Sequence, residues 1–229
     1  MAVLSRGTPV SVRNRALAGV AAGLGVLAGL GAGVLAGFAP QVRVDAAVSD
    51  ALYVGDGRPA ALGALLEVLT TPGVTWFRVL VSLPVLFWLG ARRAYRTAAW
   101  LTAAVVGVAP LTELLKEAVG RVRPAFEGGG LHYEGLSWPS GHSAGIATLV
   151  TAALVLAWPR LGSRGRRAAT AAGAALVLLV GLTRVWLGVH FPSDVLGGWS
   201  LGVVWTLLAA LAFGALPGGP AALPPRGPA

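Results

Sequence analysis

The chain has 229 residues, of which 55% are hydrophobic and only 12% are charged, and it contains no cysteine. Soluble domains carry about 25% charged residues, so the composition excludes an ordinary soluble domain and indicates a membrane protein. The net charge of +9 would also suit a nucleic-acid partner. However, most basic residues form short clusters between apolar segments, which is typical of membrane topology. Without cysteine, the chain offers no disulfide or thiolate chemistry.

Six apolar segments approach the roughly 20 residues that a membrane-spanning helix needs. In chain order they are Ala16–Phe38, Val74–Leu89, Ala98–Leu115, His142–Trp158, Ala168–Leu187 and Val195–Phe213. No internal sequence repeat divides them. We therefore predict an all-α fold, an integral membrane bundle of six helices that forms one domain over residues 1–215. Residues 216–229 are rich in proline and glycine and are predicted to be a disordered tail.

Two further features concern the first half of the chain. The segment 42–71 is too polar to cross a membrane, but Val44, Val48 and Leu52 recur at helical spacing, which predicts a short interfacial helix. A second short helix is expected over residues 60–69. Arginines before the first apolar segment also resemble a signal peptide. That segment is longer than a signal core and no small-x-small cleavage site follows it, so we expect an uncleaved span.

The basic residues predict the direction of the spans. If six spans alternate, eleven of the 18 basic residues lie on the side of the two termini, and the other seven lie opposite with all nine acidic residues. The two sides then carry +11 and −2. The first group comprises Arg6, Arg13, Arg15, Arg92, Arg93, Arg96, Arg160, Arg164, Arg166, Arg167 and Arg226. Because cytoplasmic loops are rich in lysine and arginine, we predict cytoplasmic termini and place the two short helices on the outer side.

Three polar stretches at the edges of apolar segments hold most of the ionisable chemistry, and the alternating spans place all three on the outer face. They are KEAVGRVRP (116–124), PSGH (139–142) and RVWLGVHFPSD (184–194). Lys116 at a span end could simply extend toward water, and a cationic cluster with Arg121 and Arg123 could attract lipid headgroups. Arginine can also bind two phosphate oxygens at once, which favours a phosphate site.

The other two stretches add a helix start and two histidines. Ser140 can cap a helix and Gly141 allows close approach of a ligand to free N–H groups, although an ordinary helix start explains both residues. It does not explain His142 in the first turn of an apolar span. In the third stretch, Asp194 could hold one nitrogen of His190 and leave the other free to attack. Asp194 alone would also suit a helix N-terminus.

Arg184 and Arg78 are ionisable residues at membrane depth, which makes each a candidate functional residue. Arg184 belongs to the third stretch and is predicted to bind phosphate. Arg78 lies about one and a half turns inside the second apolar segment. We expect it to extend outward to the membrane surface rather than to face the site.

The three stretches together resemble a known family. K-x6-RP, PSGH and R-x5-H-x3-D, in this order, resemble the signature of the type 2 phosphatidic acid phosphatase family. That family shares a superfamily with vanadium haloperoxidases and bacterial acid phosphatases. The motifs cover Lys116–Asp194, and the six-span architecture covers the whole chain. Thr183 stands where the family often has serine, a departure that retains the hydroxyl group.

The resemblance implies a role for each residue. His190 would attack phosphorus and form a phosphohistidine, with Asp194 orienting it, and His142 would protonate the leaving oxygen and then activate water. The phosphate oxygens would be held by Lys116, Arg123, Ser140, Gly141 and Arg184. Fixed cations would replace the magnesium of many phosphoryl-transfer enzymes, so no metal and no cofactor are expected.

The residues and the resemblance together predict a multi-pass lipid phosphatase of the cell membrane with a bell-shaped pH–rate profile. Its substrate would be a lipid phosphomonoester or pyrophosphate, such as phosphatidic acid, phosphatidylglycerophosphate or a polyprenyl pyrophosphate. The expected partners are this substrate and membrane lipids, not nucleic acid. A lipid phosphotransferase, which passes the phosphoryl group to an alcohol, is an alternative. A non-enzymatic transporter or scaffold could also carry ionisable residues in its spans.

Overall fold

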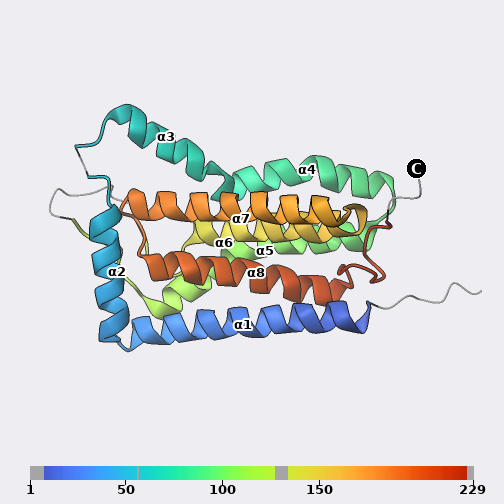
Figure 1. The fold of residues 1–229 in the computed structure, drawn as a ribbon, viewed down its shortest axis with the longest axis horizontal. Helices are drawn as coiled ribbons and strands as arrows, with labels where there is room; N and C mark the ends of the chain where they lie inside the picture. The colour runs from blue at the N-terminus through green and yellow to red at the C-terminus, as the bar shows by residue number, and fades with distance from the viewer. Residues whose placement is uncertain (1–7, 56, 127–133, 226–229) are drawn as a thin grey trace, which may run out of the picture.

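The computed structural model describes residues 8–55, 57–126 and 134–225, and the regular structure within these ranges is helical. The α helices are α1 (Val10–Leu35), α2 (Ala39–Leu52), α3 (Ala60–Thr70), α4 (Thr75–Ala91), α5 (Tyr95–Val119), α6 (Gly141–Ala157), α7 (Ser163–Trp186) and α8 (Pro192–Phe213). Two short 3-10 helices, η1 (Thr71–Gly73) and η2 (Trp158–Arg160), follow α3 and α6. Figure 1 shows α1 and α4 to α8 running along the long axis, with α2 crossing one end. Arg6 and Arg226, two of the eleven basic residues predicted on the side of the termini, lie outside the described residues.

The prediction of six membrane spans is confirmed with one change. Among the described residues, α1, α5, α7, α8 and α6 extended by η2 are long and apolar enough to cross a membrane. Helices α3 and α4, bent by 50° at their junction, together provide the candidate for the sixth span. The helix expected over residues 60–69 is therefore one arm of a broken span, and it packs against α7. Pro72 lacks a backbone N–H and interrupts the helical hydrogen bonds at this junction.

The other predicted interfacial helix is present as α2. It crosses the end of the bundle between α1 and α3 (Figure 1). Val42 and Val44 are exposed, whereas Asp45 and Ser49 are buried. The apolar side of α2 thus faces away from the protein, as suits a helix in a membrane interface. Its polar side reaches into the protein beside α8.

Helix α8 is the most buried of the candidate spans and packs against α1, α5 and α6. Gly198 and Gly202 of α8 lie against the backbone of Ser140 and Ala144, where any added Cβ would overlap a carbonyl oxygen. Small residues permit such close helix contacts within a membrane, where the lipid supplies no hydrophobic force between helices. This contact holds the start of α6 against the first half of α8, and both segments carry predicted site residues.

The prediction of a disordered tail is wrong for residues 216–225. Leu216 and Ala221 are buried and belong to an apolar cluster with Trp100 and Leu101 of α5. The Thr97 hydroxyl donates a hydrogen bond of 2.6 Å to the Ala221 carbonyl oxygen. Proline and glycine prevent a helix here, but the few apolar side chains of the segment find a surface to cover. In Figure 1 this segment and the start of α1 lie at the same end of the bundle, opposite α2.

Candidate active site

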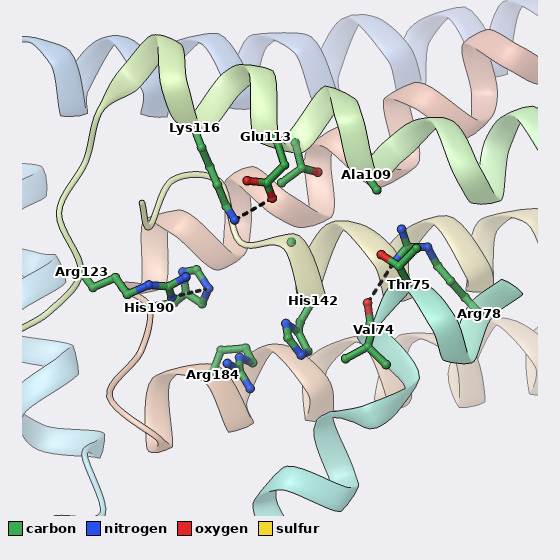
Figure 2. Close-up of a pocket in the computed structure, with 13 residues that line it drawn as sticks. Val74, Thr75, Arg78, Ala109, Glu113, Lys116, Arg123, His142, Arg184 and His190 are labelled. Atoms are coloured by element: carbon green, nitrogen blue, oxygen red, sulfur yellow. Dashed lines mark hydrogen bonds and ion pairs between the residues drawn. The ribbon is translucent and has the colours of Figure 1, made fainter. Parts of the chain in front are cut away.

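A cavity of about 300 Å³ brings together six of the eight predicted site residues. They are Lys116, Arg123, Gly141, His142, Arg184 and His190. Figure 2 shows that they come from α5, the segment after it, α6, α7 and the turn before α8. The rest of the wall is formed by Gly73, Val74, Thr75, Arg78, Ala109, Thr112 and Glu113. Four of the lining side chains are cations and one is an acid, so the cavity suits an anion.

His190 lies in the turn between α7 and α8, where it is 3% exposed. Its Nε2 atom lies 3.2 Å from Nη1 of Arg123, and its Nδ1 atom lies 3.4 Å from Oδ2 of Asp194. Because a guanidinium group only donates hydrogen bonds, Nε2 must accept and the ring proton must lie on Nδ1. The distance to Asp194 is longer than that of a good hydrogen bond, so the carboxylate acts on the ring mainly through its charge. Nε2 is therefore the unprotonated ring nitrogen, and its electron pair, which accepts from Arg123 in this structure, is the one that could serve a nucleophile.

Burial lowers the pKa of His190 to about 4, and the Asp194 carboxylate opposes this shift only in part. Arg184 and Arg123 lower the pKa further because their positive charges disfavour a protonated ring. The imidazole is therefore neutral at pH 7. A neutral ring with a free nitrogen can attack an electrophile.

Asp194 is fully buried and belongs to a network of charged groups that extends to α2. Its Oδ2 atom accepts from the Phe191 N–H at 2.9 Å, and its Oδ1 atom lies 2.6 Å from Nη1 of Arg121. Nη2 of Arg121 lies 2.7 Å from Oδ2 of Asp45. Asp45 also accepts hydrogen bonds from the N–H and hydroxyl groups of Ser193, at 2.9 and 2.5 Å. A helix at the end of the bundle is thereby linked to the residue that faces His190.

This network was not predicted from the sequence, which indicated a cationic cluster of Arg121 and Arg123 and no contact between Arg121 and the interfacial helix. In the structure the two arginines have different partners, because Arg123 contacts His190 while Arg121 turns to the two aspartates. Arg121 and Arg123 are two residues apart, and side chains at this spacing in an extended segment lie on the same side, so the spacing gave no signal of their different partners. The partner on α2 is also distant in the sequence.

The position of Ser140 differs from the prediction that it binds phosphate. It is fully buried and does not line the cavity. Its hydroxyl oxygen accepts from the Ser143 N–H at 3.5 Å as the N-cap of α6, and its own N–H donates to the Asp194 carbonyl oxygen at 2.9 Å. Ser140 therefore serves as the helix cap that the alternative interpretation described, and it ties α6 to α8. Gly141, the next residue, does line the cavity.

The remaining predicted cations come from two different helices. Lys116 lies in the last turn of α5, and its Nζ atom is 2.9 Å from Oε1 of Glu113. Arg184 lies near the end of α7, is 1% exposed and donates from Nη1 to the Thr70 hydroxyl at 3.3 Å. With Arg123, these residues surround the cavity on the side of His190 (Figure 2).

The prediction that Arg78 extends to the membrane surface is wrong. Arg78 is 2% exposed and lines the cavity. Its Nε and Nη1 atoms donate to the carbonyl oxygens of Val105 and Gly73, each at 3.1 Å. The broken span explains the difference, because the carbonyl of Gly73 lies at the break and accepts a bond from a side chain. Gly145 of α6 leaves room for the guanidinium group, since an added Cβ would overlap Nη1.

The model of the PAP2 superfamily matches residues 94–216. Phosphatidylglycerophosphatase B of Bacillus subtilis is 42% identical over 97 residues, which are 41% of this chain and 47% of that protein. The chain thus spans just under half the length of this relative. Lipid A 1-phosphatase of Rhizobium etli is 32% identical over 188 residues, which are 72% of this chain and 77% of that protein.

A solved structure agrees with the fold. The transmembrane PAP2-type phosphatidylglycerolphosphate phosphatase of Bacillus subtilis superposes with a TM-score of 0.62 at 28% sequence identity. The superposition covers 80% of this chain and 92% of that protein. Together with the apolar helices, this likeness identifies a multi-pass membrane protein.

Proposed function

Because the chain belongs to the PAP2 superfamily, we propose that it is a membrane phosphatase acting on a lipid phosphomonoester or pyrophosphate. The observation that carries the proposal is the cavity in which a buried, neutral His190 lies beside cations. The names of the similar proteins, which act on phosphatidylglycerophosphate and lipid A, support a lipid substrate. The cavity suits a headgroup at the small end of ligand-site volumes, so acyl chains would remain in the membrane.

In the proposed first step, Nε2 of His190 attacks the phosphorus atom. A nitrogen–phosphorus bond forms, the ester oxygen–phosphorus bond breaks, and the leaving oxygen takes a proton from protonated His142. Lys116, Arg123 and Arg184 stabilise the negative charge on the transferred group. Asp194 holds the proton-bearing side of the His190 ring in place.

In the proposed second step, His142 takes a proton from water, and the water oxygen attacks phosphorus. The nitrogen–phosphorus bond breaks, His190 returns to its neutral form and inorganic phosphate leaves. The cations supply the charge that a magnesium ion supplies in other phosphoryl-transfer enzymes. The donor set of the cavity does not suit a metal cation, since Glu113, the single acid among the described residues that line it, is paired with Lys116.

The proposed orientation has both termini in the cytoplasm and the cavity near the outer face. It rests on the concentration of basic residues at the end of the bundle that holds the termini. A substrate in the outer leaflet would then reach the cavity directly.

We predict that purified protein releases inorganic phosphate from at least one short-chain lipid phosphate or pyrophosphate with EDTA present. Right-side-out vesicles should also hydrolyse an impermeant short-chain substrate without being opened. Phosphatidylglycerol, which carries only a phosphodiester, is the matched control and should release none. Loss of activity with EDTA would contradict the metal-free mechanism, and activity only in opened vesicles would reverse the orientation. Phosphoryl transfer to an added alcohol in place of water would identify a phosphotransferase.

The pKa of His190 predicts where the acidic limb of the pH–rate profile lies. Because only the neutral ring can attack, kcat/KM should rise with pH through about 4, the lowered pKa. An unperturbed histidine would place this limb near pH 6.5. The measurement is kcat/KM on a soluble short-chain substrate between pH 3 and 7. Enzyme held at low pH and assayed at pH 7 controls for irreversible unfolding, and a midpoint near 6.5 would contradict the buried, neutral nucleophile.

A further inference from the structure

One cation of the cavity has no part in the proposed mechanism. Arg78 and His190 line the same cavity of about 300 Å³. In Figure 2, the His142 ring lies between Arg78 on one side and His190, Arg184 and Arg123 on the other. Attack by His190 directs the leaving oxygen toward His142, which protonates it. Arg78 therefore lies on the leaving-group side of the phosphate.

Arg78 is a buried cation that lacks an acidic partner among the described residues. It is 2% exposed, and its two hydrogen bonds go to neutral carbonyl oxygens of Val105 and Gly73. Within the described ranges its Nη2 group has no hydrogen-bond partner. Burying a charge without a counter-charge is costly, and such residues inside membrane proteins commonly contact a ligand.

The charge of the cavity wall exceeds what one phosphate group neutralises. Among the described residues, four cations (Arg78, Lys116, Arg123 and Arg184) and one acid (Glu113) line it, which gives a net charge of +3 before the proton on His142 that the proposed first step requires is counted. A phosphomonoester carries about −1.5 to −2 at pH 7. Glu113 is already paired with Lys116 at 2.9 Å. The charge of Arg78, which has no acidic partner among the described residues, favours a substrate with a further anionic group.

We infer that Arg78 binds an anionic phosphate in the leaving part of the substrate. This inference rests on the proposed function and narrows its substrate class to lipids with a second phosphate beside the one removed. A lipid pyrophosphate leaves as a lipid monophosphate, and phosphatidylglycerophosphate leaves as a phosphodiester. Both supply the anion. Phosphatidic acid leaves as an uncharged diacylglycerol and would not pair with Arg78.

The test compares kcat/KM on short-chain forms of these three lipids for wild-type protein, Arg78→Met and Arg78→Lys. Loss of one charge-assisted hydrogen bond corresponds to roughly 10- to 100-fold. Arg78→Met should lower kcat/KM by that factor more on a substrate with a second phosphate than on phosphatidic acid, and Arg78→Lys should restore part of it. Ser82→Ala is the matched control, because Ser82 is buried on the same helix and bonds only the Arg78 carbonyl oxygen. It should not change the ratio.

The substrate that shows the selective loss identifies the source of the second phosphate. Equal losses on all three lipids, or no loss on any, would overturn the inference and leave the proposed function standing. Absence of phosphate release by wild-type protein from all three lipids would overturn both.

A measurement on wild-type protein does not depend on how the variants fold. Methylenediphosphonate should inhibit at a concentration roughly tenfold or more below that of methylphosphonate, because its second phosphonate reaches Arg78. Equal inhibition constants would contradict an anion site beyond His142.

Discussion

Replacing His190 with alanine should abolish phosphate release, lowering kcat by roughly 10⁴-fold or more, since nucleophile removal has effects of that size or larger. The physical reason is that Nε2 of His190 is the proposed attacking atom, and alanine has no atom that could replace it. The other proposed reacting group, His142, is assigned to proton transfer. The measurement is phosphate release by purified protein under saturating substrate. Rapid acid-free quenching of wild-type protein with labelled substrate should also trap a phosphohistidine, and the variant should trap none.

His190→Asn is the companion variant, because its amide can still donate toward Asp194 while lacking the attacking nitrogen. It should be as inactive as His190→Ala but closer to wild type in thermal unfolding. Turnover within about tenfold of wild type in either variant would contradict the assignment of His190 as the nucleophile, because such a small loss is expected only of a supporting group.

The Arg121→Met variant should be destabilised by about 3–5 kcal/mol, the usual cost of leaving buried charges without their partner. Arg121 is the cation between Asp45 and Asp194, at 2.7 and 2.6 Å, and both carboxylates are buried. Its removal leaves two negative charges facing one another in a dry interior. Stability would be measured by chemical or thermal unfolding in detergent. Activity should fall as well, because Asp194 holds the His190 ring.

A second ion pair in the same chain provides the comparison. Glu113 pairs with Lys116 at 2.9 Å, but its side chain is 64% exposed. Removing that pair with Glu113→Gln should cost about 1 kcal/mol or less, as exposed pairs generally do. The Asp45→Asn and Arg121→Met changes should be strongly non-additive, because both act on one network. If Arg121→Met were no more destabilising than Glu113→Gln, the network would have no structural role.

Much of the architecture was predictable because it depends on local properties. Whether a run of apolar residues is long enough to span a membrane can be read from the sequence, and each predicted span coincides with a helical segment except for at most three residues at one end. The exception, the break between α3 and α4, also had a local signal in Pro72 and Gly73. The predicted tail failed for a different reason. The composition correctly predicted a segment without a helix, but the surface that buries Leu216 and Ala221 includes Trp100 and Leu101, which are more than a hundred positions away.

For the candidate site, too, one part could be predicted from the sequence and another part only from the tertiary structure. The sequence by itself singled out the residues proposed to carry the chemistry, since motif spacing points to His190, Asp194, His142 and the cations Lys116, Arg123 and Arg184. Only the tertiary structure decided what surrounds them. It turned Arg78 inward to the carbonyl groups of a broken helix and joined Arg121 to Asp45. The physical reason is that a polar group buried in a membrane protein must find its partner in three dimensions, and sequence spacing does not specify a partner on another helix.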